Sequence, residues 1–468
     1  MKKAIIIGGG VSGLATAYLL GRKAAAAGID LDITLLEQDE RVGGKIWSRK
    51  EEGYLCEWGP NGFLDNKPQT LQLCQELGAE KQLLRSNDNA RKRFIYSDGM
   101  LHQLPENGPA FLKSKLISWP GKLRLALELF AGKPPQDRDE TLADFARRRL
   151  GDEALRKLIA PMVSGIFAGD PETMSLRACF PRIAELERDY GGLIVAMIKL
   201  AKQKKKEIAA GKAVASAAGP GGVLTSFRDG IQSLTGILAE KLGPIVATGQ
   251  KAVKVSKGKS SPYRVTTESG EFDTDVVILA TPAYASAELL QDVDSFMNHQ
   301  LREIPYSSMT VACFGYERSH VKRDLNGFGY LIPKEEGMNC LGTLWDSSIF
   351  AHRAPSGKVL LRSMLGGACF PQYLNLSDLD ITDRVKADLK TIMEIKAPPS
   401  FSRIYRHEKA IPQYTVGHPQ RVELLWQKLK EHPGLFLTGN SYRGIGLNDC
   451  VAAAHRAVTE AMAHLARR

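Results

Sequence analysis

The chain has 468 residues, of which 43% are hydrophobic and 25% charged, and its formal net charge is +11. This length and composition are typical of a soluble globular protein with two or three domains. No stretch approaches the roughly 18 consecutive apolar residues that span a bilayer. The basic residues carry no zinc-finger or RRM signature, which argues against a nucleic-acid partner. The positive charge leaves three alternatives open: an anionic membrane surface, an anionic small substrate or an ordinary solvated surface.

The cysteines and the first residues bear on the cellular compartment. Seven cysteines are scattered along the chain, none lies in a CxxC pair, and their number is odd. This usage favours a reducing cytoplasm over a disulfide framework, and it predicts no structural metal site. The chain starts with a lysine pair that runs directly into an apolar stretch, without the cleavage site of a signal peptide. We therefore expect a cytoplasmic protein.

A glycine-rich turn follows the first apolar run, residues 4–7, which predicts a buried parallel strand. The pattern G-x-G-x-x-G allows a tight turn, a close approach of backbone to a pyrophosphate, and close packing of helix on strand. A helix from about Ser12 would direct its N-terminal N–H groups and positive dipole end at the phosphates. The expected contacts of this turn are Gly8, Gly9, Gly10, Val11, Ser12 and Gly13.

A second strand, LDITLLE, ends at Glu37, which lies 24 residues after Gly13. An acidic residue about 20 residues beyond the glycine turn accepts hydrogen bonds from a ribose diol in dinucleotide-binding folds. An ordinary solvated glutamate and a fold of this type with nothing bound are the alternatives. At this point the sequence leaves FAD and NAD both open.

Residues 66–215 have mainly helical patterning. The segment FLKSKLISWPGKLRLALELFAG combines apolar residues with Lys113, Lys115, Lys122 and Arg124, and it includes Trp119. Such a segment can lie on an anionic membrane, but we favour a helix packed on its own domain with its lysines outward.

Residues 291–404 alternate short apolar runs with turns, which predicts an antiparallel sheet that could form one wall of a substrate chamber. Within this range, DLDITDRVKADLKTIM predicts an amphipathic helix. The glycine-rich stretch 217–230 has no preceding strand, so we expect a loop that leads into a helix and no second nucleotide site. No Ser/His/Asp or metal-ligand pattern is evident, and no catalytic base is assigned.

Several further motifs carry a resemblance to a known family. Four segments resemble FAD-binding segments of amine-oxidase-type flavoproteins: RVGGK at 41–45, in the stretch QDERVGGKIWS that follows Glu37, CEWGPNGF at 56–63, TDVVILATP at 274–282 and GLFLTGNSYRGIGLNDC at 434–450. Their order, together with APMVSGIFAGDPETMSL and AIPQYTVGH, resembles the protoporphyrinogen/coproporphyrinogen oxidases from end to end. The likeness is greatest to the Gram-positive bacterial branch.

The resemblance implies an α/β fold in which a discontinuous, Rossmann-type FAD domain of the glutathione-reductase-like class joins an antiparallel-sheet substrate domain and a helical inserted domain. The FAD-binding domain would comprise 1–65, 216–290 and 405–468. The substrate domain would comprise 66–90 and 291–404, and the helical domain 91–215.

The resemblance also implies non-covalent FAD, because no cysteine lies in a motif for covalent flavin attachment. Cys450 is interpreted as a small packing residue. Where the family often has a tryptophan this chain has His407, which leaves a flavin-stacking contact at that position unassigned. Further implied cofactor contacts are Gln38, Arg41, Gly44, Lys45, Gly59, Pro60, Asn61, Gly62, Val253, Gly439, Asn440, Gly446, Leu447 and Asn448.

The implied reaction is the six-electron oxidation of coproporphyrinogen III to coproporphyrin III in haem biosynthesis. FAD would take a hydride at N5, and O2 would reoxidise the flavin and give H2O2. Protoporphyrinogen IX is the alternative substrate. Another FAD amine oxidase or desaturase, and a non-enzymatic binding protein like the GDP-dissociation inhibitors, are the further alternatives. Porphyrinogens autoxidise, which suggests hand-over to neighbouring enzymes; oligomeric state and peripheral membrane contact are left open.

Coproporphyrinogen carries four propionates, so a cationic chamber would favour it through charge-assisted hydrogen bonds. Lys67, just past the expected flavin turn, and Arg93, in the predicted strand RKRFIY, occupy positions where the resemblance places substrate contacts, although each could be an ordinary surface cation. Arg177 and Arg443 are weaker candidates. Aromatic side chains could pack against the pyrrole faces or belong to the core, and these are Phe328, Tyr330 and Tyr414.

Overall fold

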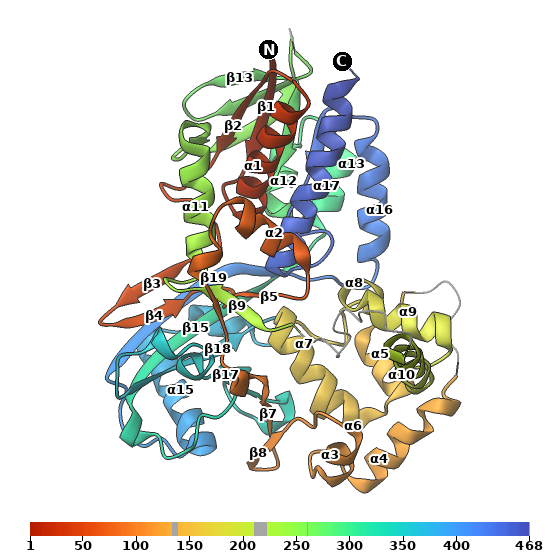
Figure 1. Cartoon of the computed structure of the whole chain (residues 1–468), viewed down its shortest axis with the longest axis vertical. Coiled ribbons are helices and arrows are strands. Elements are labelled where there is room, and N and C mark those ends of the chain that lie inside the picture. The colour runs from red at the N-terminus through yellow and green to blue at the C-terminus, as the bar shows by residue number, and fades with distance from the viewer. Residues whose placement is uncertain (133–138, 210–221, 260, 468) are drawn as a thin grey trace.

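The computed structural model of the chain describes residues 1–132, 139–209, 222–259 and 261–467. Figure 1 shows both termini at one end of the molecule, beside a parallel sheet. A larger sheet and a group of helices lie at the other end.

The parallel sheet has five strands that come from distant parts of the chain. Their order is β10 (Val246–Ala247), β2 (Leu31–Leu36), β1 (Lys2–Ile7), β14 (Val276–Leu279) and β20 (Leu435–Leu437), and all pairs are parallel. Both faces of such a sheet must be covered, which explains why most residues of its strands are apolar. The predicted strands at 4–7, 31–37 and 274–282 are confirmed.

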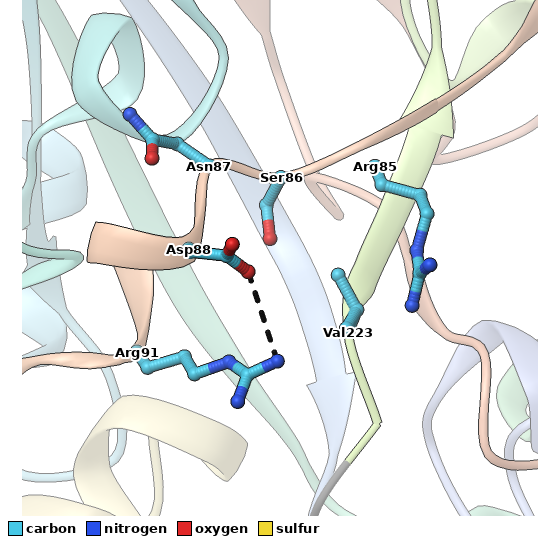
Figure 2. Close-up of a pocket in the computed structure, with 6 residues that line it drawn as sticks. All are labelled: Arg85, Ser86, Asn87, Asp88, Arg91 and Val223. Carbon is cyan, nitrogen blue, oxygen red and sulfur yellow. Dashed lines mark ion pairs between the residues drawn. The ribbon is translucent and has the colours of Figure 1, made fainter.

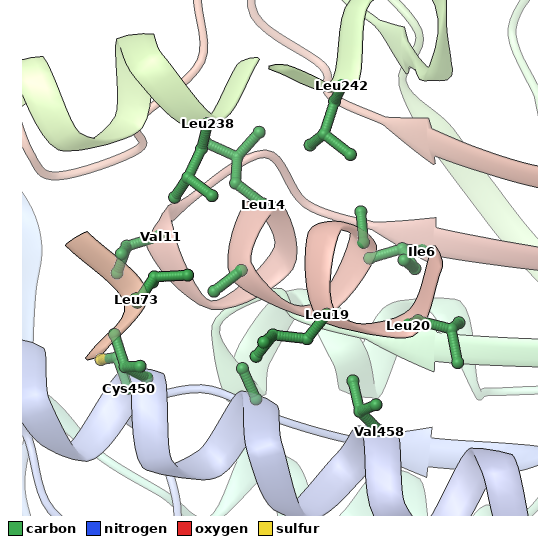
Figure 3. Packing of buried hydrophobic residues seen from close by; sticks show 14 of the residues in the cluster. Ile6, Val11, Leu14, Leu19, Leu20, Leu73, Leu238, Leu242, Cys450 and Val458 are labelled. Carbon is green, nitrogen blue, oxygen red and sulfur yellow. The ribbon is translucent and has the colours of Figure 1, made fainter. Parts of the chain in front are cut away.

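Different elements cover the two faces of this sheet. Helices α1 (Val11–Ala26), α2 (Pro68–Glu76), α11 (Gln232–Leu242) and α17 (Leu447–Ala466) share one hydrophobic cluster. Figure 3 shows Leu19 of α1 and Val458 of α17 within it. The other cluster includes residues of β11 (Ala252–Lys257), β12 (Tyr263–Thr267), α12 (Ala283–Leu289), α13 (Ser295–Arg302) and α16 (His418–Leu429), and β13 (Glu271–Thr274) pairs with β12.

The larger sheet has seven strands, antiparallel except for one pair. Their order is β19 (Phe401–Pro412), β15 (Tyr306–Glu317), β18 (Lys358–Gly366), β17 (Gly342–Leu344), β16 (Gly329–Leu331), β7 (Arg93–Ser97) and β8 (Met100–Gln103), with β16 and β7 parallel. The predicted helix is α15 (Asp378–Met393), and it packs into the cluster that covers one face of this sheet. The antiparallel sheet predicted for 291–404 is present.

The remaining elements are two small sheets and the helices of the inserted region. The sheets are β3 (Ser48–Glu51) with β4 (Tyr54–Glu57), and β5 (Phe63–Leu64) with β9 (Leu224–Phe227) and β6 (Leu83–Arg85). Helix α14 (Asp346–Ile349) precedes β18. The inserted helices are α3 (Gly108–Lys113), α4 (Trp119–Ala126), α5 (Leu142–Arg149), α6 (Asp152–Ala154), α7 (Ala160–Phe167), α8 (Leu176–Cys179), α9 (Pro181–Tyr190) and α10 (Leu193–Ala209).

Three predictions need correction. The range 91–215 is not helical at its start, because β7 and β8 form a hairpin there, turned by Asp98 and Gly99 at positive φ. The stretch 217–230 contains strand β9 rather than only a loop; residues 210–221 lie outside the described residues. Strand β19 carries residues 405–412, predicted for the FAD domain, into the seven-stranded sheet. Each of these strands pairs with distant residues, which local patterning does not show.

Candidate functional site

The first glycine turn joins β1 to α1. Gly8 has φ +108°, a conformation that favours glycine, and its N–H donates to the Leu36 carbonyl at 2.8 Å. A Cβ at Gly13 would overlap the Gly8 carbonyl oxygen, so the helix can approach the turn only with glycine there. At Gly10, which caps α1, a Cβ would meet no atom within 4 Å. The turn is therefore closed on its protein side and open at Gly10.

Glu37 lies directly against this turn. Its Oε2 accepts from the Gly9 N–H at 2.6 Å and its Oε1 from the Asp39 N–H at 3.0 Å, and the side chain is buried. These bonds hold the carboxylate in place and leave acceptor capacity for a diol. By contrast, Gln38 is exposed, and Val253 is exposed on β11.

The second glycine turn places two cations beside the first. The Gly43 N–H donates to the Gly9 carbonyl at 2.8 Å. The Arg41 guanidinium donates to the Gly44 carbonyl at 2.9 Å and stacks over Trp47, and burial lowers its pKa. The Lys45 ammonium donates to the Ala410 carbonyl at 2.5 Å, and burial lowers its pKa to about 8. Cations so placed suit an anionic pyrophosphate.

The turn 58–62 is packed tightly against its neighbours. A Cβ at Gly59 would lie 2.5 Å from the Lys45 carbonyl oxygen. A Cβ at Gly62 would overlap the Thr225 carbonyl oxygen. Asn61 is buried, and its Oδ1 has no partner among the described residues. Pro60 precedes it in the same bend. A buried acceptor without a donor is costly unless a ligand satisfies it.

The C-terminal turn comes to the same place. Gly439 has φ +117°, and a Cβ there would lie 4.0 Å from Ser12 Oγ at the start of α1. The Asn440 carbonyl accepts from the Tyr414 hydroxyl at 2.6 Å. Gly446 caps α17, whose first residue, Leu447, is buried.

Asn448 provides a second unpaired acceptor in this C-terminal turn. Its Nδ2 donates to the Leu64 carbonyl at 2.8 Å, while its Oδ1 has no partner among the described residues. Val11 and Leu447 belong to the hydrophobic cluster behind the turns. The open position at Gly10, two cations and two unpaired buried amide oxygens fit a dinucleotide with a polar ring system.

Two predicted roles around the turns have clear structural outcomes. Cys450 lies in the hydrophobic cluster of α1 and α17 (Figure 3), where burial raises its thiol pKa to about 11, so its interpretation as a packing residue is confirmed. His407 Nε2 lies 3.0 Å from the Trp58 carbonyl oxygen, and burial lowers its pKa. The imidazole is therefore held on the backbone of the 58–62 turn.

An aromatic cluster beside these turns was not anticipated from the sequence. Trp58 lies between Trp47 and Tyr405, with ring centroids 3.7 and 4.4 Å apart. The two tryptophans flank the β3–β4 hairpin, and this spacing is the signal that could have indicated the pair.

The four cationic substrate candidates do not form one cluster. Lys67 forms an ion pair with Asp449, in the first turn of α17, at 2.5 Å. Arg93 is exposed on β7 and lies over the Phe328 ring at 5.5 Å. Arg177 is exposed on α8, and Arg443 lies over Trp426 of α16.

The aromatic candidates lie mainly in the core. Tyr330 and Tyr414 are buried in two separate hydrophobic clusters, and Phe328 packs at the edge of a third. For the two tyrosines, the core interpretation therefore fits better than contact with a pyrrole face.

A hollow of about 470 Å³ lies near the β5–β9–β6 sheet, and Figure 2 shows the residues that line it. An ion pair between Arg91 and Asp88, at 3.7 Å, crosses it. The six lining residues include none of the predicted site residues, and they are Arg85, Ser86, Asn87, Asp88, Arg91 and Val223.

In the segment 108–130 the predicted outward orientation holds for Lys113 and Lys115, which are exposed, but not for Lys122. Lys122 is only 8% exposed, and its ammonium donates to the carbonyls of Leu112 and Ser114. Trp119 and Phe130 are instead 70% and 81% exposed. Lys122 is buried because its ammonium bonds to carbonyls of the preceding segment, and periodicity alone does not show such contacts. Among the described residues no helix has the length and apolarity to cross a membrane, and no cluster of metal ligands occurs.

Comparison with known proteins identifies the class. Residues 11–462 match the flavin-containing amine oxidoreductases, and the chain belongs to this family. It is an oxidoreductase whose cofactor is FAD, as predicted. The chain is 32% identical to the coproporphyrinogen III oxidase of Bacillus subtilis, over 99% of this chain and 98% of the relative.

Other relatives carry the same resemblance. The chain is 31% identical to a chloroplastic protoporphyrinogen oxidase of rice, over 99% of this chain and 88% of the relative. A solved structure from Exiguobacterium sp. 255-15, assigned as a protoporphyrinogen oxidase, superposes with a TM-score of 0.82 at 27% identity and covers 100% of this chain and 99% of that one. The predicted resemblance and fold class are confirmed.

Proposed function

We propose that this protein oxidises coproporphyrinogen III to coproporphyrin III. The observation that carries the proposal is the likeness to the Bacillus enzyme over nearly the full length of both chains. The exposed cations Lys67 and Arg93 support it, because a substrate with four propionates gains more from them than one with two.

The overall reaction consumes three O2 and yields three H2O2 as six electrons and six hydrogens leave the macrocycle. When bound, FAD supplies a two-electron acceptor at N5 that O2 reoxidises. The chain's own residues bind and orient. We propose that the glycine turns and Glu37 hold the dinucleotide, that Arg41 and Lys45 balance its charge, and that the unpaired Oδ1 atoms of Asn61 and Asn448 accept hydrogen bonds from the ring system. No catalytic base is assigned.

The competing substrate is protoporphyrinogen IX, since relatives of both kinds align along the chain. The deciding experiment is kcat/KM for the two porphyrinogens side by side, followed by porphyrin fluorescence in air with autoxidation subtracted. A preference for the tetracarboxylate supports the proposal, and a preference for the dicarboxylate overturns it in favour of the alternative. A yellow protein that turns over neither would direct attention to another FAD oxidase.

We further propose that the protein is cytoplasmic and touches membranes only peripherally, through the apolar face of 108–130. Residues 108–130 contain one carboxylate, Glu128, and it is buried in an ion pair with Arg149, while Lys113 and Lys115 are exposed. Apolar and cationic side chains without an exposed acid suit an anionic lipid surface. The exposed apolar residues of this face are Leu112, Trp119, Leu123, Leu127, Leu129 and Phe130.

Vesicle co-sedimentation tests this surface. The wild type should bind phosphatidylglycerol vesicles more strongly than phosphatidylcholine vesicles, and W119E/F130E should lose binding while turnover in solution is unchanged. Equal sedimentation of wild type and variant would contradict the proposal. M197E on α10, another exposed apolar position, serves as the matched control outside the segment.

A further inference from the structure

Two buried arginines, Arg362 and Arg353, contact the segment 57–61, which contains several of the predicted flavin contacts. Arg362, on β18, donates through Nη1 to the carbonyls of Glu57 and Gly59 at 3.1 and 2.9 Å. Its Nε lies 2.9 Å from Asp346 Oδ2, and Asp346 Oδ1 accepts from Asn61 Nδ2 at 3.4 Å. One ion pair of the larger sheet thus contacts three residues of the segment 57–61.

The second arginine fixes the start of the same segment. Arg353 Nη1 lies 2.6 Å from Glu57 Oε1, and both side chains are fully buried. Glu57 also accepts from the Ile231 N–H at 3.0 Å and from the Ser48 hydroxyl at 2.5 Å. Glu57 therefore links the α11 side of the FAD domain to the larger sheet.

These pairs are poorly explained by stability alone. Removing charges from water is unfavourable, and a buried ion pair can often be replaced by apolar side chains without loss of stability. An apolar pair, however, could not donate to the carbonyls of Glu57 and Gly59. What the guanidinium adds is a fixed direction for those carbonyls and, through Asp346, for the Asn61 amide.

We propose that Arg362 and Asp346 are positioning residues for FAD, so that cofactor affinity depends on an ion pair between the larger sheet and helix α14. They act through Gly59 and Asn61 and touch no cofactor themselves. The inference rests on the proposed contact of the 59–62 turn with the flavin. Because the ion pair lies between β18 and α14, a change in the larger sheet would be felt at the flavin turn.

The chain offers a matched control in the helical region. Arg149 is as buried as Arg362, and it pairs with Glu128 at 3.1 Å and with Glu187 at 2.5 Å. Its partners lie in the segment after α4 and in α9, and no hydrogen bond joins this cluster to residues 57–62 within the described part of the chain. The substitution Arg149→Met therefore matches the lost charge without the proposed effect on FAD.

The experiment measures the Kd of FAD for apoprotein by quenching of flavin fluorescence, together with the Tm of each apoprotein. R362M should raise the Kd about tenfold to a hundredfold, the equivalent of one to two charged hydrogen bonds. The Kd of R362K should lie between those of the wild type and R362M, since an ammonium can pair with Asp346 but lacks the planar fork for both carbonyls. R149M should lower the Tm and leave the Kd unchanged.

The double variant R362M/D346L separates positioning from folding, because it leaves no unpaired buried carboxylate. A recovered Tm with a raised Kd supports the proposal. A recovered Tm with wild-type Kd, or an equal loss of affinity in R149M, overturns it. Neither result depends on substrate, so a wild type that binds FAD but oxidises no porphyrinogen would defeat the proposed function and leave this inference standing.

Discussion

The two ends of the molecule recognise their proposed ligands by different means. At the parallel sheet, the dinucleotide turn is built mainly from backbone, with Gly8, Gly10 and Gly13 fixing the path and one side chain, Glu37, beside them. At the larger sheet, the candidates are side-chain charges such as Arg93 on β7. Adding a Cβ should therefore weaken ligand binding most at the parallel sheet, and removing a charge should weaken it most at the larger sheet.

The largest expected effect comes from two glycines three residues apart. Gly13→Val should prevent folding, because a Cβ there overlaps the Gly8 carbonyl. Gly10→Val should fold normally, since its Cβ meets no protein atom, but it should weaken FAD binding about a hundredfold by occupying the opening for the pyrophosphate. Circular dichroism and FAD titration distinguish the two. Tight FAD binding by G10V would show that the opening is not the pyrophosphate site.

The next effect compares the two substrate cations. Arg93 has no ion pair within the described residues, whereas Lys67 already pairs with Asp449. R93A should therefore raise KM for coproporphyrinogen by about tenfold, the loss of one charge-assisted hydrogen bond, and K67A should raise it less. Both substitutions should raise the KM for protoporphyrinogen less than the KM for coproporphyrinogen.

Steady-state kinetics on both substrates checks this prediction, with R188A on α9 as the control on an exposed arginine. Equal changes in KM for the two substrates would show that Lys67 and Arg93 do not recognise the additional propionates of coproporphyrinogen.

The smallest effect is a pH dependence at Lys45. Its folded-state pKa of about 8 lies below the ordinary value of 10.5, so the unfolded chain binds more protons between these values. The contribution of Lys45 to stability therefore rises with pH across that window. The Tm of wild-type apoprotein minus that of K45M should increase between pH 8 and 10.5. A difference that falls with pH would contradict the buried, desolvated ammonium.

Much of the cofactor side could be predicted from the sequence. The glycine turn, the strand that ends before Glu37 and the glycine turn before α17 are local patterns, and each lies where it was expected. The individual FAD contacts remain predictions, among them Val253, which is exposed on β11.

The larger sheet was predicted only in part. Strands β15 to β18 are indicated by their alternation, and the strand predicted at RKRFIY is β7, but the expected domain boundaries place this strand in the helical range 91–215 and not in the larger sheet. Its parallel pairing with β16 joins residues more than two hundred positions apart, which no local window contains.

By itself, the sequence determined a dinucleotide-binding class of fold, because glycine turns and apolar strands act through local backbone geometry, and its resemblance to a known family indicated FAD as the cofactor. Only the tertiary structure decided which charges are buried and paired: Lys122 inward while Trp119 faces out, and Arg362 against Asp346 beneath the 57–61 segment. Burial and pairing are properties of residues brought together from distant positions. The energies of buried charges depend on neighbouring residues, and the linear sequence does not show which residues will be neighbours.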